Sequence, residues 1–218
     1  MIVLCDNDIV LKLASFDLLE DVAALTENRE VRVLDALRPQ LLRSPKWRKK
    51  YGELALERAL SFVENSQTIT EAFDLEDSAA LIDAHYDNAE GRECAIDGGE
   101  LVLISHAFHN PDARLLTGDK RCLHALGCHR HHNARAQIIH ASLANRVLCL
   151  EAAILWCIRH HGFETLRARV VPQLNCDEAM RAVFGSGMAS QEGTVVSGLS
   201  HYMNNLEKTV GENWLWRP

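Results

Sequence analysis

The sequence predicts an α/β fold with a central parallel sheet, followed by an extension made of helices. Four short apolar runs alternate with stretches of helical spacing over residues 1–140, and only helical patterns follow over residues 141–218. The composition is that of a packed globular chain, since 47% of the 218 residues are hydrophobic and 24% are charged. Alternating strands and helices are typical of a three-layer domain, so we expect that domain over 1–140 and a helical extension packed on the same core.

The predicted elements follow from the spacing of the apolar residues. Apolar runs predict strands at residues 2–5, 31–34, 114–117 and 137–139. Apolar residues three or four apart predict helices over residues 8–25, 47–63, 75–86 and 98–108, and from Asp119 to a stop at Gly127. In the extension the same spacing predicts helices over residues 143–159, 163–170, 177–184 and 191–206. The first of these four is apolar nearly all round, so we expect it to be deeply buried.

The cysteines and the first residues indicate a cytoplasmic protein. The seven cysteines are an odd number without regular spacing, which is typical of reduced thiols. The chain turns acidic within its first eight residues, MIVLCDND, unlike a signal peptide. The apolar runs stay below the roughly 18 residues that a membrane span needs, so we expect no membrane contact.

Charge is unevenly distributed along the chain. With 23 Lys and Arg against 30 Asp and Glu, the net charge of −7 is not that of an obvious nucleic-acid-binding protein. Residues 38–58 hold seven basic and two acidic residues, residues 59–100 hold eleven acidic and one basic, and residues 113–146 hold six basic and one acidic. An acidic stretch between two basic ones fits a metal site flanked by phosphate-binding surface, although solvated helix faces would give the same pattern.

Three acidic side chains stand where an α/β sheet usually holds its ligand. Asp6 follows the first predicted strand, and Asp119 follows the predicted strand at 114–117. Ligands of open α/β sheets bind outside the carboxyl ends of the strands, so these two acids should meet there. Glu100 lies in the first turn of the helix that precedes the second of these strands. Clustered carboxylates repel one another, and a hard divalent cation is the commonest reason for them to converge.

Each acid also has a purely local explanation. Asp97 and Glu100 have the spacing of a capping box, with Asp in place of the usual Ser or Thr. Asp119 and Asp8 could each cap the helix that follows. Taken together, three acids at comparable positions favour a site.

Three segments resemble the PIN domain over about residues 1–140. They are Ile-Val-Leu-Cys-Asp-Asn-Asp-Ile-Val at the start, Asp-Gly-Gly-Glu opening a mid-chain helix, and Leu-Leu-Thr-Gly-Asp-Lys-Arg after it. The resemblance implies a PIN-like three-layer α/β fold and the activity of an endoribonuclease that uses Mg²⁺ or Mn²⁺. It also implies that Asp6, Glu100 and Asp119 are catalytic metal ligands, that Asp97 assists them, and that Asp8 supports Asp6.

PIN proteins usually carry a further acid on an earlier helix. Four residues of this sequence compete for that place, namely Glu64, Glu71, Glu76 and Asp77. The helical extension is no part of the minimal domain. A chain without the further acid would keep the fold and bind RNA or a protein partner without cutting, which is the second hypothesis.

The expected partners are RNA, a second copy of the chain, and an antitoxin or other protein. Many bacterial PIN proteins are toxins or RNA-processing nucleases, and exposed faces of the extra helices could support a homodimer. Basic residues beside Trp47 and Tyr51 suit a single strand, because cations hold its backbone while a ring stacks on a base; Trp47 could equally turn into the core. The basic residues expected to hold RNA are Arg43, Lys46, Arg48, Lys49, Lys50, Lys120 and Arg121.

Two other chemistries compete with the nuclease. Asp6 and Asp8 also fit the D-x-D opening of haloacid-dehalogenase-like phosphatases, in which the first Asp is the nucleophile and the second a general acid and base. That interpretation lacks the acid expected soon after Gly118-Asp119 and gives Glu100 no role. A structural zinc could be held within the run that contains Cys122, His124, Cys128, His129, His131 and His132, although the spacing is not that of a standard zinc knuckle.

Overall fold

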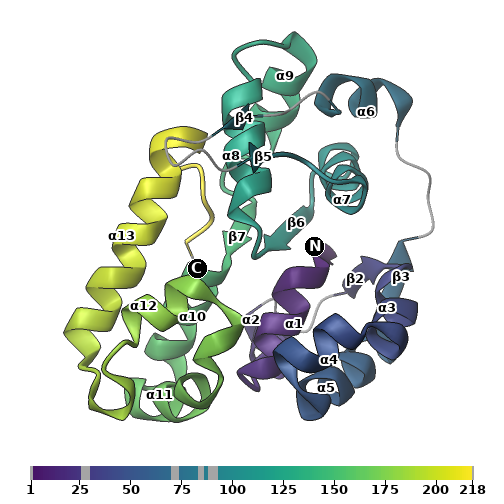
Figure 1. The fold of residues 1–218 in the computed structure, drawn as a ribbon. Coiled ribbons are helices and arrows are strands. Elements are labelled where there is room, and N and C mark those ends of the chain that lie inside the picture. Colours follow the sequence, from purple (N-terminus) through teal and green to yellow (C-terminus); the bar gives the residue numbers. More distant parts are fainter. Residues whose placement is uncertain (1, 26–29, 70–73, 83–85, 88–92, 218) are drawn as a thin grey trace.

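The computed structural model describes residues 2–25, 30–69, 74–82, 86–87 and 93–217. Its centre is a sheet of five parallel strands in the order β3-β2-β1-β6-β7 (Figure 1). In chain order the strands are β1 (Ile2–Cys5), β2 (Glu30–Leu34), β3 (Gln67–Ile69), β6 (Ala113–Thr117) and β7 (Val147–Cys149). β1 is the middle strand and pairs with β2 on one side and with β6 on the other. The order of the strands reverses between β1 and β6, which is the switch point at which α/β sheets bind ligands.

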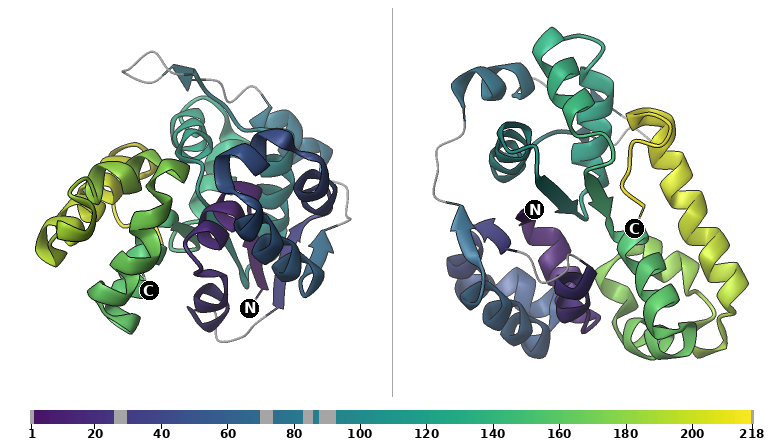
Figure 2. Two further views of the ribbon diagram at one scale, coloured as in Figure 1. Left: turned by 60° about the horizontal axis from the view of Figure 1, so that its bottom comes forward. Right: turned by 180° about the vertical axis from the view of Figure 1, so that it is seen from behind.

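Helices cover both faces of this sheet, so the α/β class predicted from the sequence is confirmed (Figures 1 and 2). One face carries α1 (Asn7–Ser15), α2 (Leu19–Leu25), α3 (Leu37–Arg43), α4 (Pro45–Tyr51) and α5 (Glu53–Glu64). The other carries α6 (Leu75–Leu81), α7 (Gly98–His109), α8 (Lys120–His129) and α9 (Ala134–Ser142). A sheet covered on both faces needs apolar strands throughout, which explains the runs Ile-Val-Leu-Cys and Val-Leu-Cys. Two short strands, β4 (Tyr86–Asp87) and β5 (Glu93–Cys94), form a separate antiparallel pair.

The remaining helices form the extension, which packs against the same core. It comprises α10 (Leu150–His161), α11 (Phe163–Val170), the 3-10 helix η1 (Val171–Cys176), α12 (Glu178–Val183), the 3-10 helix η2 (Gly187–Ala189) and α13 (Glu192–Val210). α13 runs along α8 and α10 at one edge of the molecule (Figure 1). Beyond it the chain returns to the sheet, where Leu215 bridges Val147 and the Trp216 main-chain N–H donates to Val147 O at 2.8 Å. Buried residues of the extension and of the sheet therefore belong to one continuous hydrophobic cluster.

Two predicted elements near residue 140 are wrong. Residues 137–139 lie inside α9, and the fifth strand, β7, lies within the stretch predicted as a helix over 143–159. A run of only two or three apolar residues does not distinguish a strand from a buried helix, and β7 passes into α10 without an intervening turn residue. The sheet therefore takes in residues beyond the expected boundary at 140.

Several long predicted helices are broken, and one expected helix end is absent. Asp17, at φ 60°, separates α1 from α2, and Gly52, at φ 82°, separates α4 from α5. Gly127 does not end α8 but allows close packing, because a Cβ there would lie 2.9 Å from the Thr209 carbonyl oxygen on α13. In the described part of the chain, none of the helices has the length and apolar character that a membrane crossing requires.

Candidate functional site

Asp6 and Asp119 lie side by side at the carboxyl ends of β1 and β6. The two strands pair in parallel with Cys5 opposite Leu116, and the Asp6 main-chain N–H donates to Leu116 O at 3.0 Å. Thr117 links the two acids, because its hydroxyl donates to Asp6 Oδ2 at 3.2 Å and accepts from the Asp119 N–H at 3.1 Å. Asp6 occupies the N-cap position of α1, but its side chain makes no capping hydrogen bond there.

Asp97 and Glu100 form the capping box expected from their spacing. Asp97 Oδ1 accepts from the Glu100 N–H at 2.9 Å, and Glu100 Oε2 accepts from the Asp97 N–H at 2.8 Å. The reciprocal bonds fix both side chains at the start of α7. Glu100 is buried, so the box also holds a carboxylate inside the protein.

Five carboxylates meet in one cavity of about 410 Å³, which we call the carboxylate cavity. Trp47 and Tyr51 of α4 form part of its wall. Trp47 also packs against the hydrophobic core, so it is a wall residue with one buried side. The acids that line the cavity are Asp6, Asp8, Asp97, Glu100 and Asp119.

Two of these acids have strongly raised pKa values. Burial raises the pKa of Asp6 to about 7, and the charges of Asp8 and Asp119 add to the rise. Burial likewise raises the pKa of Glu100 to about 8, against the opposing hydrogen bond from the Asp97 N–H. Burial pushes the pKa of Asp119 upward too, but hydrogen bonds and the charge of Arg121 outweigh it and hold that pKa below its ordinary value. The cavity thus contains acids that resist full ionisation at neutral pH.

Asp119 is already engaged by an exposed cation. Arg121 Nη2 lies 2.6 Å from Asp119 Oδ2, and the Arg121 main-chain N–H donates to Asp119 Oδ1 at 2.8 Å. Asp119 therefore caps α8, as its position allowed, while its side chain still lines the cavity. The guanidinium side chain is 68% exposed, so this ion pair is the kind that contributes little to stability.

A buried lysine that the sequence analysis missed lies beside Asp8. Lys12 Nζ lies 2.5 Å from Asp8 Oδ2 and 2.8 Å from Asp177 Oδ2, and donates to Gly118 O at 3.3 Å. Tyr51 adds a hydroxyl that donates to Asp8 Oδ1 at 3.4 Å. Asp8 is in the first turn of α1 and does not cap it. The spacing of Asp8 and Lys12, four residues apart on a helix, was the available signal for this pair.

The predicted RNA-binding residues separate into two groups. Lys50, Lys120 and Arg121 line a second cavity that adjoins the first. The other four lie on the exposed surfaces of α3 and α4 and line neither cavity, and Arg48 Nε pairs with Glu53 Oε1 at 2.6 Å. These four are Arg43, Lys46, Arg48 and Lys49.

The further acid of the PIN pattern is not found among its described candidates. Glu64 pairs with Arg38 at the surface, while Glu76 and Asp77 belong to α6 and do not line the carboxylate cavity. Glu71 lies outside the described residues. An acid that the sequence analysis missed, Glu151, lies in the first turn of α10 soon after β7, but it is buried in an ion pair with Lys120.

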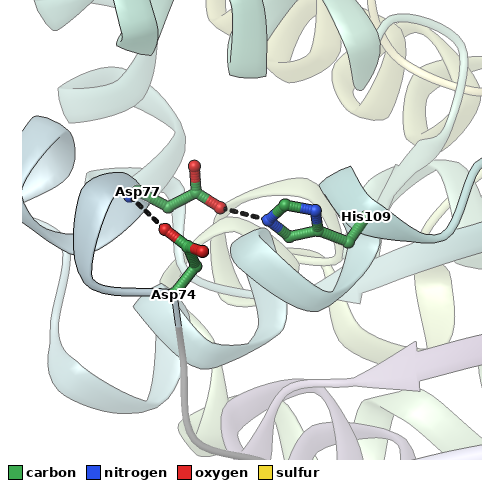
Figure 3. Close-up of side chains that lie close together, drawn as sticks. All are labelled: Asp74, Asp77 and His109. Carbon is green, nitrogen blue, oxygen red and sulfur yellow. Dashed lines mark hydrogen bonds and ion pairs between the residues drawn. The ribbon is translucent and has the colours of Figure 1, made fainter.

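A different cluster could hold a metal ion. Asp74, Asp77 and His109 offer ligand atoms that all lie within 4.8 Å of one another, and in the described part of the chain they are the group of three that meets this spacing (Figure 3). Among the described residues, no three of the five acids that line the carboxylate cavity have ligand atoms within 4.8 Å of one another. Asp77 is fully buried and already accepts from Ser105 Oγ at 2.9 Å and from Arg135 Nε at 2.9 Å, with His109 Nε2 2.8 Å away. These three partners satisfy the buried Asp77 carboxylate without a metal ion. The positive charge of Arg135 would also repel a metal cation bound there.

The cysteines and histidines after Arg121 do not meet as a zinc site within the described residues. Cys122 is buried in α8, and burial raises the pKa of its thiol well above the ordinary value, which disfavours the thiolate that zinc needs. His124 pairs with the Thr209 hydroxyl at 3.1 Å and His129 with Ala80 O at 2.8 Å. Both rings are therefore explained by packing between helices.

No family model matches this chain, and no match is found for it among curated proteins or solved structures. What the carboxylate cavity can do therefore follows from its own geometry and charge.

Proposed function

We propose that the chain is a metal-dependent nuclease that hydrolyses phosphodiester bonds in single-stranded RNA. The observation that carries this proposal is that five acidic side chains line one cavity at the switch point of the sheet. The choice of RNA, and of a PIN-like enzyme, rests on the resemblance of the segments that contain Asp6, Glu100 and Asp119.

The acids that line the cavity have the donor atoms that a hard divalent cation takes, although among the described residues no three of them lie as close together as Asp74, Asp77 and His109. The donors in the cavity are carboxylate oxygens, which Mg²⁺ and Mn²⁺ prefer. Burial and mutual repulsion raise the pKa values of Asp6 and Glu100, and a cation would relieve both effects. Asp6, Glu100 and Asp119 would hold the cation, which when bound would supply Lewis acidity and a water of lowered pKa.

The other side chains have roles of their own. Asp97 fixes the Glu100 carboxylate through the capping box, so its role is positioning. Lys12 neutralises Asp8 and holds the Gly118 carbonyl next to Asp119. Arg121 is free to exchange Asp119 for an RNA phosphate, because its pair with Asp119 is exposed.

The phosphatase hypothesis gives Asp8 a role that its ion pair with Lys12 opposes. A general acid at Asp8 would have to carry a proton, whereas Lys12 holds its carboxylate in an ion pair at 2.5 Å. Activity on a small aryl phosphate that survives loss of Glu100 would favour the phosphatase.

The test compares Asp119→Asn with wild type in Mn²⁺-dependent cleavage of a single-stranded RNA. Asn still caps a helix, so the variant should fold while cleavage falls by orders of magnitude. Asp74→Asn is the matched control, because Asp74 also caps a helix, α6, and belongs to the cluster with Asp77 and His109. Equal cleavage by Asp119→Asn and wild type would overturn the proposal, and loss of cleavage in Asp74→Asn alone would move the site to that cluster. A folded wild type that binds RNA without cutting it would favour the binding-scaffold hypothesis.

A further inference from the structure

A second polar cavity, of about 460 Å³, shares Asp8 and Asp119 with the carboxylate cavity. Its other walls come from parts of the chain that are distant in sequence: α4, the start of α8, and the segment of the extension formed by η1 and α12. We call it the cationic cavity after the five basic residues that line it, Lys12, Lys50, Lys120, Arg121 and Arg181.

Three of these cations are already neutralised. Lys12 pairs with Asp8 and Asp177, Lys120 with the buried Glu151, and Arg121 with Asp119. Their positive charge is therefore balanced before any ligand arrives.

The two remaining cations stand on different walls. Lys50 comes from α4, where its ammonium lies 4.7 Å from the centre of the Tyr51 ring, and Arg181 comes from α12. Both are exposed, and within the described part of the chain neither lies within 4.0 Å of an acidic oxygen. They can therefore bind an anion without first giving up an ion pair.

We infer that the cationic cavity holds a backbone phosphate of the single strand, next to the bond that is cleaved at the carboxylate cavity. This inference rests on the proposed function. Because the two cavities share Asp8 and Asp119, a strand that crosses the carboxylates passes directly into the cationic cavity. Lys50 on α4 and Arg181 on α12 would both contact the phosphate, and Arg121 would join them when it leaves Asp119.

The inference gives the extension a part in substrate binding. Asn175 and Arg181 line the cationic cavity, and both belong to the extension rather than to the sheet domain. The ion pair between Lys12 and Asp177 fixes this segment against α1. Arg181 is therefore assigned as a substrate-binding residue that the resemblance to PIN domains does not include.

The test measures binding of a short fluorescein-labelled single-stranded RNA to the full chain in EDTA, over a range of salt concentrations. The variant is Lys50→Ala with Arg181→Ala. The control is Lys208→Ala with Arg159→Ala, which removes the same charge from residues on α13 and α10 that line neither cavity. For single strands the log-log salt slope falls by about 0.7 per phosphate contact, so the variant should lose up to about 1.4 and the control nothing.

The outcomes separate the two proposals. A reduced slope in the variant alone supports phosphate binding in the cationic cavity, whereas failure of wild type to cut RNA in Mn²⁺ would remove the proposed function and, with it, the cleaved bond beside that phosphate. An unchanged slope in a variant that folds, or an equal loss in the control, overturns the inference while leaving the nuclease intact. Absence of RNA binding by wild type overturns the inference outright. Arg181→Lys should recover part of the slope, because it keeps the charge without the planar fork.

Discussion

Lys12 Nζ lies 2.8 Å from Asp177 Oδ2, which joins the first helix of the sheet domain to the extension. Both side chains are nearly inaccessible, at 9% and 8% exposed. Burial lowers the pKa of Lys12, but the charges of Asp8 and Asp177 outweigh it and hold the pKa above its ordinary value. The ammonium is therefore charged in the interior, beside the candidate site.

Asp177→Asn should lower the free energy of unfolding by about 1.5–3 kcal/mol, the range for hydrogen bonds to charged groups. Asn keeps the cap on α12, where Asp177 Oδ1 accepts from the Met180 N–H at 2.9 Å, so the loss reports the charge alone. A double-mutant cycle in urea with Lys12→Met should show the two residues coupled by 1 kcal/mol or more. Additive effects within about 0.5 kcal/mol would mean that the ion pair does not tie the extension to α1.

Glu100→Gln should stabilise the metal-free protein at high pH. The folded pKa of Glu100 is raised to about 8, whereas an unfolded Glu titrates near 4.3, so ionising it costs folding energy that accumulates as pH rises between these values. Gln preserves the capping box and removes the charge. In EDTA, urea unfolding should show equal stabilities near pH 4 and an advantage for the variant on the order of 1–4 kcal/mol at pH 8. A difference that stays constant with pH would refute the raised pKa.

Mn²⁺ should stabilise wild type and leave Asp6→Asn unaffected. At 100 times its dissociation constant, a ligand that binds only the folded state adds about 2.7 kcal/mol, or about 5–10 °C in Tm for a chain of this size. Removing the Asp6 charge relieves repulsion in the cavity, so in EDTA the variant should melt at or above wild type. The measurement is four melting curves at neutral pH: wild type and Asp6→Asn, each with and without Mn²⁺. They show whether the stabilisation by Mn²⁺ requires the Asp6 carboxylate. If Asp6→Asn melts lower and keeps the Mn²⁺ response, Asp6 is structural and the metal lies elsewhere.

The sequence predicted that the acids of the candidate site share one edge of the sheet because its signals are local. A strand that ends in Asp needs only a few residues to be recognised, so Asp6 and Asp119 were placed at one edge of the sheet, and the capping box of Asp97 and Glu100 has a fixed spacing. The meeting of these segments in one cavity then followed from the rule that parallel strands present their carboxyl ends together.

The extension's share of the site has no such local signal. Asp177 and Arg181 reach the cationic cavity only through the packing of α12 and η1, and nothing in their neighbouring residues indicates that they lie near Lys12 or Lys50. Glu151 was missed for a related reason, because β7 has three residues and merges into the apolar start of α10. Contacts between segments that are distant in sequence could therefore not be predicted from the local patterns of residues.

Gly118→Ala should impair both stability and cleavage. A Cβ at position 118 would lie 2.6 Å from Asp8 Oδ2 and 3.3 Å from Lys12 Nζ, and the ion pair between those two side chains resists moving aside. Overpacking of this kind costs about 1–3 kcal/mol. Gly193→Ala is the matched control, since nothing lies within 4 Å of its Cβ and Ala suits the start of α13. Equal melting temperatures for Gly118→Ala and wild type, with full cleavage, would show that the side chains of Asp8 and Lys12 can move aside at little cost in stability.

Asp77→Asn should destabilise the protein without affecting Mn²⁺-dependent cleavage. Asp77 is fully buried and joins three helices, because it accepts from Ser105 of α7 and Arg135 of α9 while lying on α6 itself. Asp77→Asn removes the charge that Arg135 and Ser105 bind inside the protein and should lower the free energy of unfolding measurably, whereas Asp74→Asn leaves its cap on α6 in place and should cost little. Urea unfolding measures the first effect, and cleavage at a temperature where all variants are folded measures the second. If the acids near His109 instead formed the working metal site, cleavage would fall in both variants, and the stability of Asp77→Asn in EDTA would approach that of wild type because a repulsive cluster had been relieved.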